Sequence, residues 1–149
     1  MNSMEGIFQG FDIAAAGMRA ELLRSEIVSA NISNMHSTGN HEREPYRRRT
    51  VIFEEVLESA PGLAGDDGLR ARGVRVARVV EDRKTPFPAR HEPGHPDADE
   101  NGFVLMSNVN LFKELVDLSV IERSFEANLA AMRAYRTMLQ AAVSNIGRS

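Results

Sequence analysis

Each end of the chain carries two apolar tracks with helical spacing, and the two tracks lie on opposite sides of the helix that they predict. In the N-terminal stretch, 7–34, Ile13 and Leu23 belong to one track, and Phe11 and Met18 belong to the other. Each track repeats at alternating intervals of three and four residues, as in helices that pack along their length. Paired positions of the two tracks are two residues apart, which is about 200° of helical rotation. A helix on the surface of a monomer needs only one apolar face.

The C-terminal stretch, 111–146, repeats this arrangement, and we name its two sides the large track and the small track. Asn110 or Asn108 can cap the start of this helix, because an Asn side chain accepts a hydrogen bond from a free backbone N–H. Gly147 marks its expected end. The large track is Leu111, Leu115, Leu118, Glu122, Phe125, Leu129, Met132, Arg136, Leu139, Val143 and Ile146. The small track is Val120, Ser124, Ala127, Ala131, Ala134, Met138 and Ala141.

The middle of the chain, 36–107, contains all six prolines and is not predicted to be helical. The sequence at 60–72 is typical of a flexible loop, and 84–102 is expected to be extended because it is rich in proline and charge. Three runs have the composition of short β-strands, namely 46–53, 74–80 and 103–106.

These patterns predict a mainly α fold with a small β-rich middle. The two long terminal helices are expected to pair as a coiled-coil-like hairpin, with short strands and extended loops between them. The helical domain is then discontinuous, formed by 1–36 and 108–149. The segment 37–107 forms the β-rich or extended part, with a flexible loop at 54–72.

An antiparallel hairpin buries one track of each helix and leaves the other two tracks in water. The predicted strands are short and poor in large apolar side chains, so we do not expect them to cover helices of this length. The remaining tracks must then meet other copies or other proteins. The alternative is a single-chain hairpin folded onto its own β layer, with the second tracks loosely buried.

Composition excludes several classes of protein. The formal net charge of −3 and the pI near 5.8 argue against nucleic-acid binding, which usually requires a basic surface. The sequence has no cysteine, which excludes disulfides, a thiol nucleophile and Cys-ligated metals. No apolar run is long enough for membrane insertion. A cleaved secretion signal is not expected either, because the first basic residue, Arg19, follows Glu5 and Asp12.

A combination of motifs resembles a known family. The run 29–34 places Asn31 and Asn34 three residues apart at the end of the predicted helix, and a Thr-Gly turn follows at 37–39. This resembles the signature of bacterial flagellar rod and hook proteins. Other stretches are similar to a proximal-rod protein of that family, and the resemblance covers nearly the whole chain except about 54–72. These stretches are 45–47, 51–53, 73–76, 79–82, 93–104, 108–110, 123–128 and 146–148.

The resemblance implies a structural, non-enzymatic subunit of the flagellar basal-body rod, the torque-transmitting shaft that crosses the periplasm. In such proteins both termini form an inner helical domain and the middle forms the outer part. They are exported largely unfolded by the flagellar type III apparatus, without a cleaved signal peptide. The implied partners are copies of the chain itself, other proximal and distal rod proteins, the adaptor between rod and export gate, and the export apparatus.

Contacts between subunits are expected to involve apolar positions of both helices and the two asparagines. Asn31 and Asn34 either bond backbone at the helix end or contact other subunits, and the sequence favours neither. Glu122 and Arg136 interrupt the large track, so each requires an opposite charge if it is buried, or else the polar face widens there. The expected subunit-packing residues are Ile13, Leu23, Ile27, Asn31, Asn34, Leu115, Leu118, Phe125, Leu129, Met132, Leu139 and Val143.

No catalytic residue, metal site or cofactor is predicted. The run 97–102 matches the first half of a calcium loop, but Asn108 stands where the loop requires a bidentate Glu, so a turn bonded to its own backbone is favoured. His91 and His95 have the spacing of helical zinc ligands, but Pro93 and Gly94 between them prevent a helix. The run 47–49 is favoured as a solvated arginine face of a strand over a grip on an acidic partner.

Three alternatives remain open from the sequence. One is a soluble adaptor built on a helical hairpin. Another is a sibling rod or hook protein. The last is an enzyme that uses Asp97, Asp99 and His95.

Overall fold

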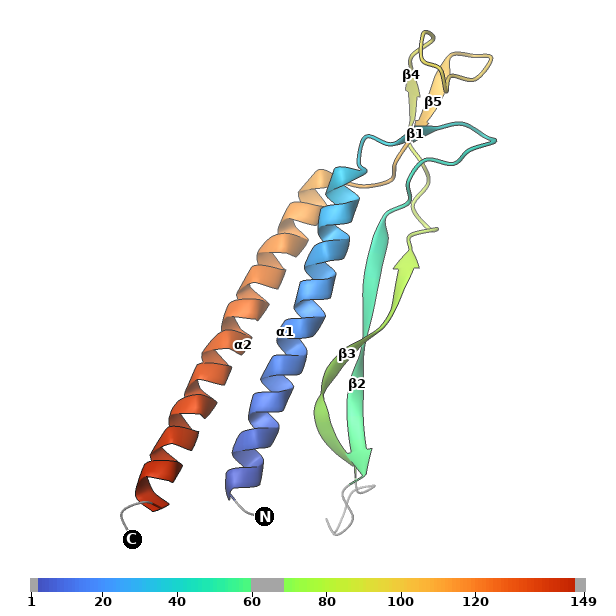
Figure 1. Cartoon of the computed structure of the whole chain (residues 1–149). Helices are drawn as coiled ribbons and strands as arrows, with labels where there is room; N and C mark the ends of the chain where they lie inside the picture. The colour runs from blue at the N-terminus through green and yellow to red at the C-terminus, as the bar shows by residue number, and fades with distance from the viewer. Residues whose placement is uncertain (1–2, 60–68, 147–149) are drawn as a thin grey trace. The chain divides into compact units, whose positions relative to one another are not determined.

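A computed structural model of the chain describes residues 3–59 and 69–146 (Figure 1). Two long helices enclose five strands in the sequence, so the prediction of a mainly α fold with a β-rich middle is confirmed. The elements are α1 (Ser3–Ser33), β1 (Thr38–Gly39), β2 (Arg49–Ser59), β3 (Leu69–Glu81), β4 (Ala89–His91), β5 (Phe103–Met106) and α2 (Leu111–Ile146).

Asparagines define the two helix ends that face the middle of the chain. The Asn110 side-chain oxygen accepts a hydrogen bond from the backbone N–H of Lys113 at 3.2 Å, so the predicted N-cap of α2 is confirmed at Asn110. At the end of α1, the Asn34 side-chain amide donates to the carbonyl of Ala30 at 2.8 Å. The Ala30 carbonyl thereby has two donors, because it also accepts from the backbone N–H of Asn34 at 3.1 Å.

The strands β2 and β3 form a two-stranded sheet and run side by side in opposite directions (Figure 1). They are 11 and 13 residues long, so the prediction of short strands is wrong for this pair. The loop expected at 54–72 is strand at both ends, and its centre, 60–68, lies outside the described residues. Glu54 of β2 pairs with Arg75 of β3, and opposite charges across a strand pair stabilise the sheet where sequence composition suggested a loop.

A second sheet has the order β1-β5-β4, with both neighbours antiparallel to β5. Thr38 is opposite Met106, and Arg90 is opposite Val104, whose side chain is fully buried. Gly39 has no room for a side chain, since a Cβ there would lie 2.2 Å from the carbonyl oxygen of Arg43. The predicted strand at 103–106 is confirmed as β5.

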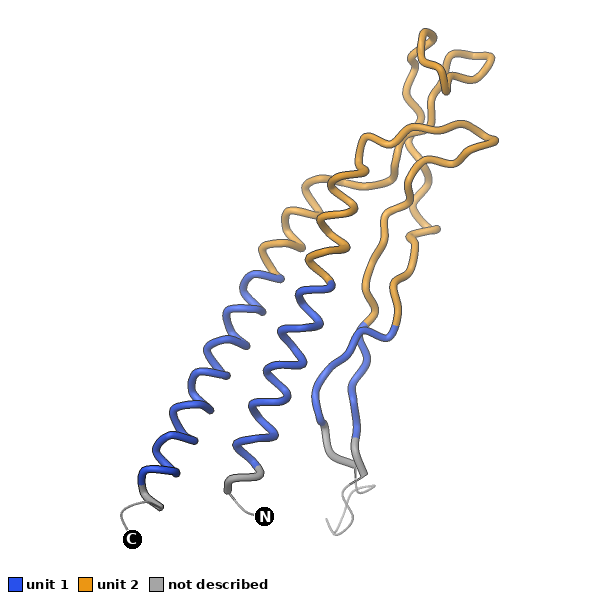
Figure 2. The backbone as a smooth tube through the Cα atoms, viewed as in Figure 1, with its two compact units in different colours: residues 1–23, 53–77, 121–149 blue, residues 24–52, 78–120 orange. Residues whose placement is uncertain are grey.

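The chain divides into two compact units, coloured separately in Figure 2. Unit 1 contains Met1–Leu23, Phe53–Ala77 and Ile121–Ser149, and unit 2 contains Arg24–Ile52 and Arg78–Val120. Each unit therefore includes part of both helices and part of the β2–β3 pair. The domain division expected from the sequence, 1–36 and 108–149 against 37–107, follows different boundaries and stays a prediction.

Within unit 1, the glycines of α1 are sites of close approach. A Cβ at Gly10 would lie 2.2 Å from Cζ of Tyr135, and one at Gly17 would lie 2.9 Å from the side-chain nitrogen of Asn128. On another side of α1, a Cβ at Gly73 of β3 would lie 3.0 Å from Cβ of Ala16. In this unit α1 thus contacts both α2 and a strand, so the strands cover part of its second face.

Few hydrophobic side chains lie in the interior. Among the described residues, the buried hydrophobic ones are Ala14, Ala20, Val28, Val104 and Ile121. Phe8, Ile13 and Leu22 are exposed on α1. More large hydrophobic side chains are exposed on α2, namely Leu111, Phe112, Leu115, Val116, Val120, Met138 and Val143. The shortage of burial that the two-track pattern predicts is therefore observed on both helices, and most clearly on α2. None of the helices in the described part of the chain is both long and apolar enough to cross a membrane.

The glycines of α1 generate a paired prediction. A Cβ at Gly6 would have no atom within 4 Å, so Gly6→Ala should stabilise the helix by about 0.5–1 kcal/mol through backbone entropy. Gly10→Ala gains the same propensity but forces the Tyr135 ring to move, and should destabilise by about 1–3 kcal/mol. Thermal unfolding followed by circular dichroism compares the two. Equal melting temperatures for the two variants would contradict the observed packing of Tyr135.

Candidate functional site

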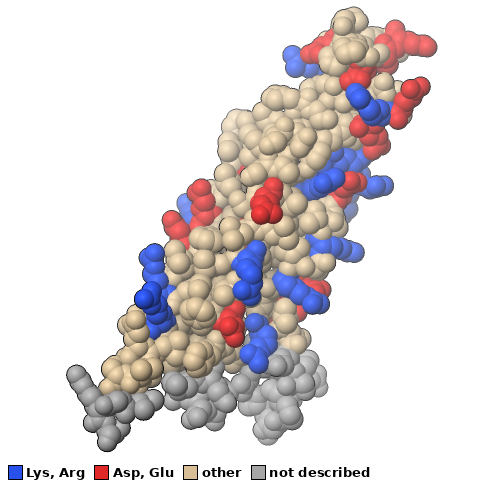
Figure 3. Space-filling view, in the orientation of Figure 1, with Lys and Arg blue, Asp and Glu red and all other residues tan. Residues whose placement is uncertain are grey.

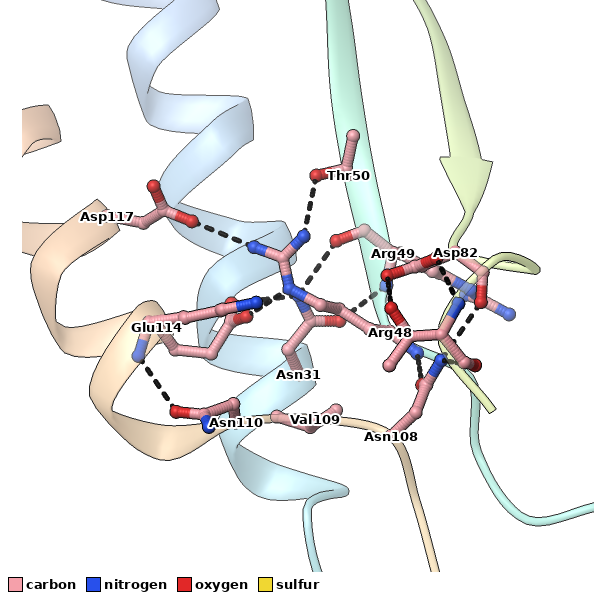
Figure 4. A network of polar contacts seen from close by, with 12 residues as sticks. Asn31, Arg48, Arg49, Thr50, Asp82, Asn108, Val109, Asn110, Glu114 and Asp117 are labelled. Carbon is pink, nitrogen blue, oxygen red and sulfur yellow. Dashed lines mark hydrogen bonds and ion pairs between the residues drawn. The ribbon is translucent and has the colours of Figure 1, made fainter. Parts of the chain in front are cut away.

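A buried polar cluster in unit 2 is centred on Asn31, which is 0% exposed (Figure 4). Its side-chain nitrogen donates to the Arg49 carbonyl at 2.8 Å and to the Glu114 carboxylate at 2.9 Å. Its side-chain oxygen accepts from the Arg49 N–H and from the Tyr46 hydroxyl, both at 2.9 Å. These bonds use the full donor and acceptor capacity of an amide. Asn31 thereby fastens the end of α1 to the start of β2 and to the first turn of α2.

Glu114 is the second member of the cluster, and its side chain is also 0% exposed. Nε of Arg48 donates to Oε1 of Glu114 at 2.5 Å, and Nη2 of Arg48 donates to Asp117 at 2.8 Å. Figure 4 shows the guanidinium pointing toward both carboxylates and toward the hydroxyl of Thr50, 3.2 Å away. Asp117 also pairs with Arg24 of α1 at 3.2 Å. A buried carboxylate is tolerated only when it is paired and hydrogen-bonded, and both conditions hold here.

Burial of Tyr46 raises the pKa of its hydroxyl, and the nearby Glu114 carboxylate adds to this effect. The hydroxyl therefore stays protonated and remains a donor to Asn31. The Arg49 guanidinium lies 5.5 Å from the centre of the Tyr46 ring, within the range of a cation–π contact.

Two of the arginines at 47–49, Arg47 and Arg48, have acidic partners within the chain, so the interpretation of the run as a solvated strand face is wrong for these two. Arg48 pairs with both Glu114 and Asp117. Arg47 lies 4.1 Å above the ring of Phe87 and bonds the exposed carboxylate of Glu44. That bond lowers the pKa of Glu44 and raises the pKa of Arg47.

Asn108 has a structural use other than capping. Its oxygen accepts from the Arg48 N–H at 2.7 Å, and its nitrogen donates to the carbonyls of Asp82 and Thr85 at 2.9 and 3.1 Å. It holds the chain entering α2 against the end of β3. The Thr85 hydroxyl in turn bonds the Asp82 carboxylate and lowers its pKa.

The two aspartates of the calcium-like run are bonded to the chain's own donors. Asp99 accepts from the backbone N–H groups of Asn101 and Phe103 at 2.9 and 2.8 Å, so the predicted backbone-bonded turn is confirmed. Asp97 accepts from the Thr38 hydroxyl at 2.7 Å and from Arg43 at 2.9 Å. Among the described residues, no group of three His, Cys, Asp or Glu side chains is arranged to hold a metal ion.

Comparison with known proteins agrees with these motifs. The family model for the C-terminal region of flagellar basal body rod FlgEFG proteins matches residues 100–145. The flagellar basal-body rod protein FlgC of Borreliella burgdorferi is 33% identical over 93% of this chain and 97% of its own length. FlgC of Bacillus subtilis is 35% identical over 91% and 95%, and FlgC of Salmonella typhimurium is 34% identical over 87% and 90%.

The chain belongs to the FlgC family of flagellar basal-body rod proteins. It is therefore a structural rod subunit of the flagellar basal body and not an enzyme. The alternative of a soluble adaptor is not favoured. The two asparagines that end α1 have different roles in this FlgC-family chain. Asn31 is buried in the cluster, and Asn34 bonds the exposed end of α1.

The expected subunit-packing residues of this FlgC-family chain lie in three environments. Asn31 is fully buried, and Leu23, Ile27, Leu118, Phe125, Leu129, Met132 and Leu139 are half-buried. Ile13, Asn34, Leu115 and Val143 are exposed. Contacts within one chain do not test packing between subunits, so this role stays a prediction.

Of the small track of α2, five residues are exposed, namely Val120, Ala127, Ala134, Met138 and Ala141.

Glu122 and Arg136 are exposed within the single chain, so neither requires a buried partner there. The cluster around Glu114, by contrast, had no local signal in the sequence. Glu114 and Arg48 are 66 residues apart, and only the fold shows that they meet.

The buried ion pair generates a double-mutant prediction. Arg48→Met leaves the Glu114 carboxylate buried without its cation and should destabilise the protein by about 3–5 kcal/mol. Adding Glu114→Leu removes the unpaired charge and should recover most of that loss. Urea unfolding of the two single variants and the double variant measures the coupling. Additive losses would contradict the direct pairing.

Acid should weaken the Thr38–Asp97 contact. The Thr38 hydroxyl bond, followed by the Arg43 charge, holds the Asp97 pKa below its usual value. A lowered folded-state pKa adds stability above about pH 4, and this stability is lost as the pH falls through the lowered pKa. Thr38→Val should therefore reduce the urea midpoint at about pH 7 and have a smaller effect at about pH 2. Thr137→Val is the control, since its hydroxyl bonds only a helix carbonyl. An equal effect of Thr38→Val at both pH values would refute the linkage.

Proposed function

We propose that the chain is a subunit of the proximal rod, whose terminal helices assemble with copies of itself and other rod proteins into an axial shaft that transmits torque. The observation that carries the proposal is the exposed small track of α2. Five of its seven positions are exposed, and alanines among them allow helix axes to approach closely. A monomer gains nothing from such a face in water, whereas an assembly can bury it.

We further propose that α1 and α2 pair in coiled-coil fashion. Contacts between the two helices recur at positions of α1 that are seven residues apart, which is the heptad period. These contacts are Gly10 with Tyr135 and Gly17 with Asn128 in unit 1, and Arg24 with Asp117 and Asn31 with Glu114 in unit 2.

The buried cluster supports a mechanical role. Polar contacts in an otherwise apolar helix interface specify one register, because a shift leaves charges unpaired. Glu114 would lose both Arg48 and Asn31 if α2 slid along α1 by one turn. A fixed register lets axial helices transmit torque without slipping.

The remaining features of the proposal come from the family. The helical domain at 1–36 and 108–149 would be the inner part of the rod, and 37–107 would be the outer part. The chain would be exported unfolded by the type III apparatus, without a cleaved signal peptide, and would assemble in the periplasm. Its neighbours would include proximal and distal rod proteins and the adaptor to the export gate.

Two substitutions test assembly through the helices. Leu129→Asp should abolish incorporation into basal bodies, because it puts a charge among the expected subunit-packing residues of α2. Val143→Asp should lower incorporation by at least about tenfold while leaving the fold intact, since Val143 is 63% exposed in the single chain. Incorporation is measured by quantifying the chain in purified basal bodies, together with swimming motility.

Ser144→Asp is the matched control, because it places the same charge on an exposed neighbouring position outside both tracks. It should incorporate normally. Normal motility of the Leu129→Asp and Val143→Asp variants would overturn the proposal.

A further inference from the structure

A groove of about 520 Å³ lies in unit 1 between α1 and the β2–β3 pair. Leu23, Val56 and Val74 give it an apolar floor, and Asp12 and Arg19 of α1 stand on its rim. The floor residues Leu23, Val56 and Val74 are half-buried, so the groove exposes apolar surface between charged groups. Figure 3 shows separated charged side chains among larger uncharged areas on the visible face.

The two rim charges on α1 are available to a partner. Asp12 and Arg19 are both exposed, and neither takes part in an ion pair within the described part of the chain. Arg72 and Arg75 also line the groove, and both already interact within the chain, Arg75 with Glu54. The groove therefore offers a negative and a positive charge seven residues apart on one helix, about 10.5 Å along its axis.

The exposed side of α2 in unit 1 carries the complementary arrangement. Glu126 and Arg133 are exposed, are also seven residues apart, and have no ion pair among the residues that the structure describes. Ala130 lies between them on the same side of the helix, so a neighbouring surface can approach closely. The charge order along the chain is negative then positive on both helices.

We propose that this groove receives α2 of a second copy of the chain, antiparallel to α1, with Glu126 against Arg19 and Arg133 against Asp12. This inference rests on the proposed function and specifies one contact within it. Equal spacing lets both ion pairs form together. A parallel arrangement would place Asp12 against Glu126 and Arg19 against Arg133, so like charges select the antiparallel direction.

The contact repeats an orientation that already exists inside the chain. Gly10 meets Tyr135 and Gly17 meets Asn128, so the chain's own α2 is antiparallel to α1 in this unit. A second α2 in the groove would place α1 between two antiparallel neighbours. Such a contact passes from one copy to the next and so builds a ring or a filament rather than a closed pair.

Charge reversal tests the pairing in basal bodies from cells that lack the native chain. Arg19→Glu and Glu126→Arg should each lower incorporation by about tenfold, because each puts like charges together. The double variant restores opposite charges in every copy and should return incorporation to within about twofold of native. Circular dichroism of the purified variants checks the fold, which exposed positions should leave unchanged.

The inference would be overturned if the single variants incorporate normally, or if the double variant incorporates no better than the single variants. These results leave the proposed function standing, provided that the native chain is found in basal bodies. Absence of the native chain from basal bodies would instead refute the proposed function.

Cross-linking gives an independent readout, because the chain has no cysteine of its own. Cells co-express two variants that carry one cysteine each, Asp12→Cys and Arg133→Cys, and basal bodies are treated with a short bismaleimide. A dimer linked between the two variants is expected. The control pair, Asp12→Cys with Ser144→Cys, moves the second cysteine eleven residues along α2 and should give little dimer. Equal yields from both pairs, or no dimer from the first, would refute the contact.

Discussion

The carboxylate of Glu114 is fully buried, and the arrangement of unit 2 follows from what it requires. An unpaired carboxylate in such a place would cost several kcal/mol, so a cation and a hydrogen-bond donor must reach it. Arg48 supplies the cation and Asn31 supplies the donor. These three residues come from α2, from the segment before β2 and from α1. One charge thus fixes the relative positions of three segments that are far apart in the sequence.

Much of this fold could be predicted from the sequence wherever the signal is local. The helices, the cap at Asn110 and the turn at Asp99 depend on neighbouring residues, and each was predictable from spacing and residue type. The full lengths of β2 and β3 were not predictable, because Glu54 suggests a strand end until Arg75 is seen across from it. The role of Arg48 was missed for the same reason, since its partner is 66 residues away.

Surplus apolar surface is present in this chain, but it is divided unequally between the two helices. In unit 1, α1 contacts α2 and Gly73 of β3, but Phe8, Ile13 and Leu22 stay exposed on it. The unburied surface is mostly on α2, where Phe112 is 80% exposed and Val116 and Val143 are each 63% exposed. In the single chain, α2 therefore carries more of the exposed apolar surface than α1.

The sequence separations inside the polar cluster determine when unit 2 can fold. Asn31 and Glu114 are 83 residues apart, and Arg24 and Asp117 are 93 residues apart. Contacts between residues so far apart in the sequence form late, because the entropy cost of closing a long loop must be overcome before any bond is gained. The interior of this unit is therefore incomplete until the last third of the polypeptide is available to fold.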